Sequence, residues 1–282
     1  MIFILQLIIF LLIVFIYLHI RFQLKTNNNL EVYEIDYDTN ENLQKTCDIR
    51  VPVLFDAPSS SPPPPEFTKE QNRAEINVKD ATEPPAAPPV KFSYSAAIDL
   101  IHEDKMQKYY SDNNADFIEN EGLTDEYRKF DDIFAPQMTA QRDYDIIIGS
   151  RHVSTPLRFH TNYRKFLYVS SGQATIKLAT WKNEKYLNTV YNWADFDFYS
   201  LMDETAQKEC DKCTFIEVIV PCGKVISIPP YWWYSIKMTH SENENKTIIY
   251  SFSYKTYMNL VAILPKLLLH FIYNNNFIAV KN

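Results

Sequence analysis

The first twenty residues constrain the fold most, because none of them carries a formal charge. Met1 to Ile20 has only Gln6 and His19 as polar interruptions, so no face of a helix there is polar enough to lie at a protein surface. Twenty helical residues span a hydrocarbon core of about 30 Å. We therefore predict a transmembrane anchor over residues 1–20. The main alternative is a cleaved signal peptide, which normally has a basic start and a small-residue cleavage site that this stretch lacks.

The residues that flank the predicted anchor suggest its orientation. Arg21 and Lys25 follow it and no Lys or Arg precedes it, which favours a cytosolic position for the large domain. Four cysteines need no partners in such a reducing compartment. The sequon Asn245-Lys246-Thr247 points the other way. Abundant Asn, Lys, Ile and Tyr fit an AT-rich genome such as that of a large DNA virus, so a virion membrane and a host membrane are both candidates.

Composition bounds the class of protein. A chain of 282 residues that is 46% hydrophobic is long enough to bury a sizeable core. A net charge of -7 gives no reason to expect a nucleic-acid partner, since phosphate binding needs a concentrated basic face. The chain has only four glycines, where average usage of roughly 7% would give about twenty.

The part of the chain that follows the anchor predicts short elements around a proline-rich loop. We expect strands near Leu30–Tyr37 and Val51–Phe55, then a solvated loop over 57–90 that holds one short strand, INVKDA. An amphipathic helix is expected from Phe92 to Tyr110, with Ser95 as its N-cap. The only His-x-Asp triplet of the chain, at 102–104, falls where this helix turns polar, which predicts a solvated face and no metal site.

Beyond Asp143 the periodicity becomes that of strands. Short β-rich runs are separated by Gly, Asn, Asp or Pro, a pattern typical of a double-sheet jelly roll or cupin-like barrel. The predicted fold class is mainly β with flanking helices, a double-stranded β-helix over residues 28–260 behind the N-terminal helix. The apolar segment 258–273 is interrupted by Pro265 and Lys266, which makes it too short for a second span. We expect it to form a C-terminal helix that caps the barrel or contacts a second subunit in a homo-oligomer.

Two passages resemble a known family. They are YDIIIGSRHVSTPLRFHTNYRKFLYVSSGQATIKL, over 144–178, and GKVISIPPYWWYSIK, over 223–237. Together they resemble the JmjC-like branch of the cupin superfamily, which includes protein hydroxylases related to factor inhibiting HIF. Gly149, Gly172 and Gly223 stand where that family has glycine. The resemblance extends more loosely from about residue 30 to about residue 260.

The resemblance implies a site for Fe(II) and 2-oxoglutarate, built from two histidines and one carboxylate. This chain departs from that pattern at each ligand. Alignment on Thr155-Pro156-Leu157 puts Arg158 at the first histidine and His160 at the aspartate, whereas alignment on the following strand puts Phe159 and Thr161 there. Tyr234 takes the place of the distal histidine.

Two further positions bear on the cosubstrate and on zinc. The lysine that often pairs with 2-oxoglutarate in the family corresponds to Ala174, and the nearby Lys177 has the opposite facing parity along the strand. Cys210 and Cys213 resemble half of a zinc site, but only Cys222 lies near them in the sequence, which favours a plain loop. His152 and His240 are expected in loops.

These departures predict a membrane-anchored JmjC-like domain that is catalytically inactive and acts as a binding or structural module. Its pocket, bounded by Arg158, His160, Trp232 and Tyr234, would hold an anionic ligand or a peptide strand of a partner protein, with no metal or cofactor. The alternative is a divergent Fe(II)/2-oxoglutarate-dependent protein hydroxylase that uses His160 as one ligand. A third interpretation is a virion or membrane scaffold that assembles through the C-terminal helix.

Overall fold

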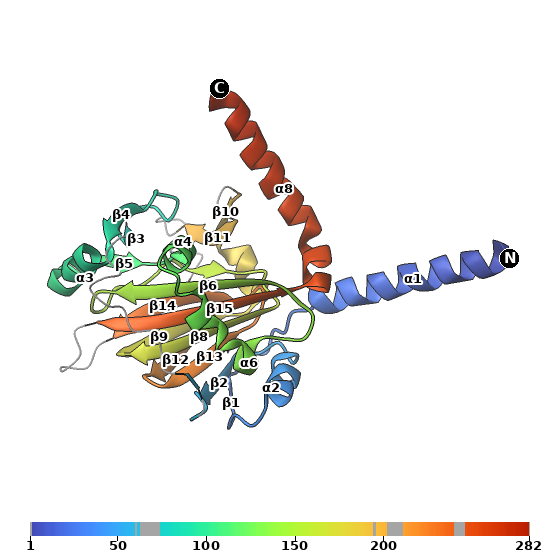
Figure 1. The fold of residues 1–282 in the computed structure, drawn as a ribbon, viewed down its shortest axis with the longest axis horizontal. Coiled ribbons are helices and arrows are strands. Elements are labelled where there is room, and N and C mark those ends of the chain that lie inside the picture. Colours follow the sequence, from blue (N-terminus) through green and yellow to red (C-terminus); the bar gives the residue numbers. More distant parts are fainter. Residues whose placement is uncertain are drawn as a thin grey trace.

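The computed structural model describes residues 2–59, 61–62, 74–193, 196–201, 211–239 and 246–281, with side chains up to residue 275. In these ranges the chain is mainly β, with two sheets, flanking helices and a long apolar helix at the N-terminus (Figure 1). This confirms the expectation of a mainly β fold with helices.

The larger sheet has nine strands and is antiparallel except at one edge, where β1 and β2 are parallel. Its order across the sheet is β1 (Tyr33–Glu34), β2 (Val53–Asp56), β13 (Lys224–Ile228), β8 (Arg164–Ser171), β15 (Thr247–Thr256), β6 (Thr139–Gly149), β5 (Tyr109–Ser111), β3 (Glu75–Asp80) and β4 (Val90–Ser93).

The smaller sheet has six antiparallel strands. Its order is β10 (Asn188–Asn192), β11 (Asp197–Leu201), β7 (Arg158–Phe159), β14 (Trp233–Thr239), β9 (Gln173–Ala179) and β12 (Ile216–Pro221).

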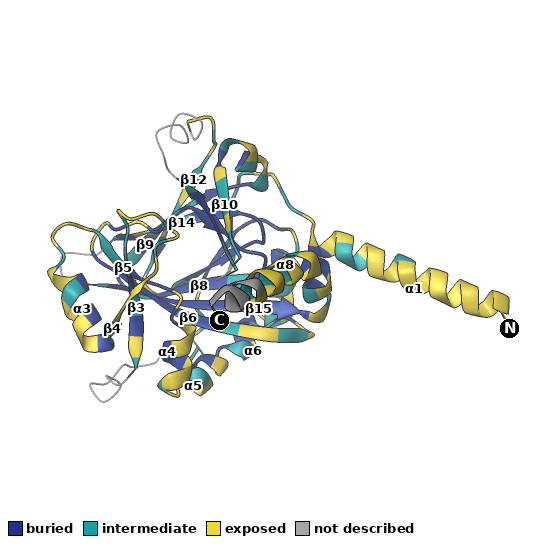
Figure 2. Cartoon of the chain, turned by 90° about the horizontal axis from the view of Figure 1, so that it is seen from above, coloured by how far each residue is buried: buried dark blue, intermediate teal, exposed yellow. Residues whose placement is uncertain are grey.

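A core fills the space between the two sheets. Every second residue of a strand points to the same face, and the inward positions of the central strands are largely aliphatic. Leu167 and Ile249 of the larger sheet belong to the same buried cluster as Ile176 and Ile236 of the smaller sheet. The central strands are accordingly buried in Figure 2.

Helices cover the opposite face of the nine-stranded sheet. They are α2 (Asn40–Cys47), α3 (Tyr94–Glu103), α4 (Ala115–Asn120), α5 (Thr124–Arg128) and α6 (Asp131–Phe134). A second core forms beneath them, in which Phe134 of α6 packs on Phe166 and Phe252 with ring centroids 4.9 and 5.0 Å away. Both faces of this sheet are therefore buried.

A third, aromatic core lies on the outer face of the six-stranded sheet. Phe159 packs against Phe198 and Trp233, with ring centroids 5.0 and 4.9 Å apart, and the 3-10 helix η2 (Trp181–Tyr186) adds Trp181. The C-terminal helix α8 (Tyr257–Lys281) starts directly after β15.

The amphipathic segment after residue 92 is shorter as a helix than the sequence predicted. Helix α3 begins at Tyr94, and its N-cap is Ser93, whose hydroxyl accepts the Ala96 N–H; the prediction of Ser95 was wrong. The helix ends at Glu103 because the Asp104 carboxylate accepts three later backbone N–H groups, at 2.7 to 2.9 Å, and so stabilises a turn. The residues that follow form β5 instead of more helix.

Three other boundaries differ from the predictions. The strand expected over 30–37 is reduced to β1, whereas the short strand predicted between the proline clusters is present as β3. Helix α8 starts at Tyr257 and continues through Pro265 to Lys281, beyond the predicted end at residue 273. Helix α1 (Ile2–Gln23) contains the apolar segment predicted over residues 1–20, from residue 2 on, and ends later than predicted, at Gln23. It is long and apolar enough to cross a membrane.

Candidate functional site

The inward face of the nine-stranded sheet changes from apolar to polar toward one end. Along β15 the inward residues run from Ile249 to Ser251 and Ser253. The residue opposite Ser253 on β8 is Lys165, and the residue opposite Ser251 on β6 is Asp145. A band of polar side chains thus crosses three neighbouring strands on a face that is otherwise a hydrophobic core.

A cavity of about 130 Å³ lies at this polar band, between the two sheets. We call it the polar cavity. The polar and charged side chains that line it include Arg158, His160, Lys165, Asp145, Asp197, Asn113 and Tyr234. Arg158, His160 and Tyr234 were all predicted from the sequence to share one pocket, and the structure brings these three together.

Trp232 does not line the polar cavity. It is fully buried in the core between the sheets, and its indole Nε1 donates to the Arg50 carbonyl at 3.2 Å. Trp233 points to the opposite side of the sheet and packs in the aromatic core. Successive residues of an extended chain face opposite sides, so the two neighbouring indoles pack in two different cores.

Arg158 is held by a buried carboxylate that the sequence analysis did not identify. Its Nη1 lies 2.6 Å from Oδ2 of Asp112, which directly follows β5 and is completely buried. Lys79 approaches the other oxygen of this carboxylate at 3.3 Å. Burial alone would raise the pKa of Asp112, but the charges of Arg158 and Lys79 outweigh it and lower the pKa. The carboxylate therefore stays ionised and fixes the guanidinium.

Arg158 and Tyr234 are direct neighbours across two strands. They are paired in the register of β7 and β14, and the guanidinium carbon lies 5.6 Å from the centre of the Tyr234 ring. This geometry is within the range of a cation–π contact. The positions where the resemblance implies two metal ligands are thus occupied by a cation and a phenol that contact each other.

His160 lines the cavity and is held by a backbone carbonyl. The side chain is 8% exposed, Nε2 lies 3.1 Å from the Ile228 carbonyl oxygen, and Nδ1 has no hydrogen-bond partner. Burial lowers the pKa of His160 well below its ordinary value, and the charge of Lys165 lowers it further. The imidazole is therefore neutral near pH 7. Because a carbonyl only accepts, Nε2 carries the proton, and the unprotonated Nδ1 is itself buried.

The remaining charges of the cavity have polar partners of their own. Lys165 donates to the hydroxyls of Ser251 and Ser253, at 2.9 and 3.2 Å. Asp145 accepts the backbone N–H groups of Asn113 and Asn114, at 3.0 and 2.7 Å. Burial, together with the charge of Asp112, raises the pKa of Asp145. The two cations of the lining, Arg158 and Lys165, balance its two carboxylates, Asp145 and Asp197.

These residues do not fit the Fe(II) site that the resemblance implies. Such a site needs two imidazoles and a carboxylate, whereas the three corresponding positions carry a guanidinium, an imidazole and a phenol. Across the described part of the chain, no three His, Cys, Asp or Glu side chains are grouped so that they could hold a metal ion.

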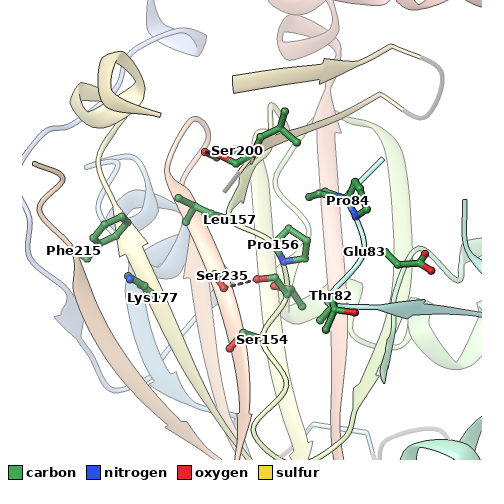
Figure 3. A pocket seen from close by; sticks show the side chains of 14 residues that line it. Thr82, Glu83, Pro84, Ser154, Pro156, Leu157, Lys177, Ser200, Phe215 and Ser235 are labelled. Carbon is green, nitrogen blue, oxygen red and sulfur yellow. Dashed lines mark hydrogen bonds between the residues drawn. The ribbon is translucent and has the colours of Figure 1, made fainter. Parts of the chain in front are cut away.

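A larger groove, of about 600 Å³, lies on the outer face of the six-stranded sheet. In Figure 3, Lys177 and Phe215 form one side of it, Thr82, Glu83 and Pro84 the other, and Pro156 and Ser235 lie between them. The Lys177 amine lies 4.2 Å from the centre of the Phe215 ring. Lys177 therefore faces this groove and points away from the polar cavity, as its position along the strand predicted.

The other residues weighed in the sequence contribute no site among the described residues. His102 and Glu103 are exposed at the end of α3, and His152 is exposed in a loop with a φ of 64°. His240 and Cys210 lie outside the described residues, so the structure does not test the half zinc site.

Asp112, Asp145 and Lys165 were missed by the sequence analysis. A signal for the last two was present, since DYDIII and RKFLYV place a charged residue two positions before an apolar residue on the same face of the strand. A charge on the inward face of a strand marks a polar site. Asp112 gave no such signal, because it lies in a loop.

No family model matches the chain, and no curated protein matches it either.

Proposed function

We propose that this chain is a membrane-anchored, JmjC-like double-stranded β-helix domain that binds a small polar group without catalysing a reaction. The observation that carries this proposal is the contact among Arg158, Asp112 and Tyr234. Arg158, whose charge is neutralised by the buried Asp112 carboxylate, stands where the resemblance implies a metal ligand. A structural ion pair therefore takes the place of that ligand. The scaffold of the family is then kept for binding while its chemistry is lost.

The geometry of the polar cavity supports a small ligand. Its volume is well below the roughly 300 to 1,000 Å³ of pockets for drug-sized molecules. Arg158 and Lys165 can donate, and the carboxylates of Asp145 and Asp197 can accept. Because the lining has as many carboxylates as cations, a highly charged anion gains little there. A single carboxylate or amide, such as the end of a peptide side chain, fits better.

The apolar helix α1 supports the anchor. Its apolar stretch is long enough to cross a membrane, and none of it is buried within the protein. An unburied helix of this composition is stable in a bilayer and costly in water. With Arg21 directly after the apolar residues, we propose that the domain faces the cytosol.

Metal and cosubstrate binding by the full chain test the proposal. The purified chain in detergent is incubated anaerobically with Fe(II), its iron content is measured, and 2-oxoglutarate is titrated in by calorimetry. We expect no stoichiometric iron and no cosubstrate binding. One tightly held iron per chain, with consumption of 2-oxoglutarate, would contradict the proposal.

One alternative is a divergent hydroxylase in which His160 binds iron, since its Nδ1 has no hydrogen-bond partner. The variant His160→Ala separates the two functions. If the wild-type chain holds iron and the variant does not, the alternative is supported. His152→Ala is the matched control, because His152 is exposed in a loop and lies outside the lining of the polar cavity.

A further inference from the structure

Helix α8 has one face that is docked on the protein. The Lys266 amine lies over three rings of the aromatic core, 5.3 Å from the centre of Phe159, 5.1 Å from Phe198 and 5.0 Å from Tyr231. One turn later His270 Nδ1 contacts the Trp193 carbonyl. These contacts fix which side of the helix faces the barrel.

The other face of α8 is apolar and exposed. Val261, Leu264, Leu268 and Phe271 are 43%, 50%, 51% and 64% exposed, and their spacings of three and four residues form one stripe along the helix. Lys266 is the only charged residue from 257 to 275, and it faces the aromatic core. The stripe, which we call the α8 stripe, is therefore uninterrupted by charge.

The α8 stripe starts beside the apolar helix α1. The two helices contact each other, and both leave the same end of the domain (Figure 1). The base of α1 is fixed to the domain, because Gln23 is buried and the Arg50 guanidinium lies 5.4 Å from the Phe22 ring. A bilayer that α1 enters is therefore close to the start of α8. Figure 2 shows that α1 is exposed along nearly its whole length.

We propose that α8 lies along the surface of the bilayer that α1 enters, with the α8 stripe in contact with lipid. This inference rests on the proposed anchoring by α1. A lipid surface fits the stripe better than a second copy does, because protein interfaces combine an apolar centre with a polar rim and the stripe has no charged rim. Exposed Tyr257 and Tyr273 near its two ends suit the boundary between lipid and water. Helices with one apolar face commonly bind bilayers in this way.

Photo-crosslinking to lipid tests the inference with the full chain. The protein is reconstituted into phosphatidylcholine vesicles that contain a diazirine-labelled phosphatidylcholine, irradiated, and digested for mass spectrometry. We expect lipid adducts on α1 and on residues of the α8 stripe. Adducts on α1 alone would overturn the inference and leave the anchor intact. Adducts on neither helix would overturn both.

A charge-insertion variant sharpens the test. The double substitution Leu264→Lys and Leu268→Lys should reduce lipid adducts on α8 at least tenfold while those on α1 persist, which also shows that the variant is still inserted. Ile219→Lys is the matched control, because Ile219 is an equally exposed apolar residue on β12, at 59%, and belongs to the edge of the six-stranded sheet. It should leave both sets of adducts unchanged. Unchanged α8 adducts in the double variant would contradict the inference.

Discussion

The space between the two sheets has an apolar end and a polar end, although the same strands build both. At the apolar end, Ile249 and Leu167 pack against Ile236 from the opposite sheet. At the polar end, the next inward positions carry Ser251 and Lys165. The register of β15 with β8 is continuous from Ile249 to Ser253, so the difference between the two ends lies in which side chains alternate inward. The apolar end provides stability by burial, and the polar end retains costly buried charges that contribute little net stability.

The largest effect is expected where one partner of the buried ion pair is removed. Asp112→Ala leaves the Arg158 guanidinium buried without its carboxylate and should lower the free energy of unfolding by about 3–5 kcal/mol. Denaturant unfolding of the variant and the wild-type chain measures this difference.

Replacing both partners distinguishes stability from function at the polar end. The double variant Asp112→Leu with Arg158→Met removes both charges and should recover most of the lost stability. If the double variant is as unstable as Asp112→Ala, the ion pair itself stabilises the fold and the two ends do not differ in the way proposed.

At the apolar end, truncating a buried side chain should lower the free energy of unfolding. Ile236→Ala removes a fully buried side chain between the sheets and should lower the free energy of unfolding by about 2–5 kcal/mol. Ile219→Ala, on the exposed edge of the same sheet, should change it by no more than about 0.5 kcal/mol. Similar effects at both positions would mean that this core is loosely packed.

The turn that joins the two sheets at the apolar end gives a smaller effect. Gly172 has a φ of +75°, and an added Cβ would lie 2.5 Å from Thr247 Oγ1 and 3.0 Å from its Cα. Gly172→Ala should therefore cost about 2 kcal/mol of stability, from backbone strain and this contact. Gly223, at +87° with nothing within 4 Å of such a Cβ, is the control for strain alone and should cost about 1 kcal/mol. Equal losses of stability in the two variants would show that Thr247 moves away from the added methyl group at no cost.

The smallest effect concerns pH at the polar end. Burial holds the pKa of His160 below its value of about 6.5 in the unfolded chain, so the unfolded state binds a proton that the folded state does not. Stability contributed by this histidine is thus present above pH 6.5 and is lost as the pH falls below it. Between pH 7 and 5.5 the wild-type chain should lose about 1 kcal/mol more than His160→Gln. An equal loss in both chains would show that folding does not shift the pKa of His160.

Some features of the fold follow from local patterns, and the structure agrees with them. The apolar run at the N-terminus predicted α1, and the alternation after residue 143 predicted β-strands. Where a local rule had two close candidates, the sequence was insufficient. Ser93 and Ser95 are both good caps, and the choice depended on the pairing of β4 with β3 and on the turn around Asp104. The length of α8 was underestimated because the prediction ended with the apolar run at residue 273, whereas the helix continues through the asparagines that follow to Lys281.

By itself, the sequence determined the apolar N-terminal helix, the mainly β character, and three of the residues that share one cavity, because these depend on hydrophobicity, on a period of two and on short motifs. Only the tertiary structure decided that Asp112 neutralises Arg158, that His160 is held by a backbone carbonyl, and that α8 exposes one apolar face beside α1. Asp112 and Arg158 are 46 residues apart; Asp112 follows β5 of the larger sheet, whereas Arg158 lies on β7 of the smaller sheet. Contacts of this kind depend on strand order and register, which no local pattern encodes.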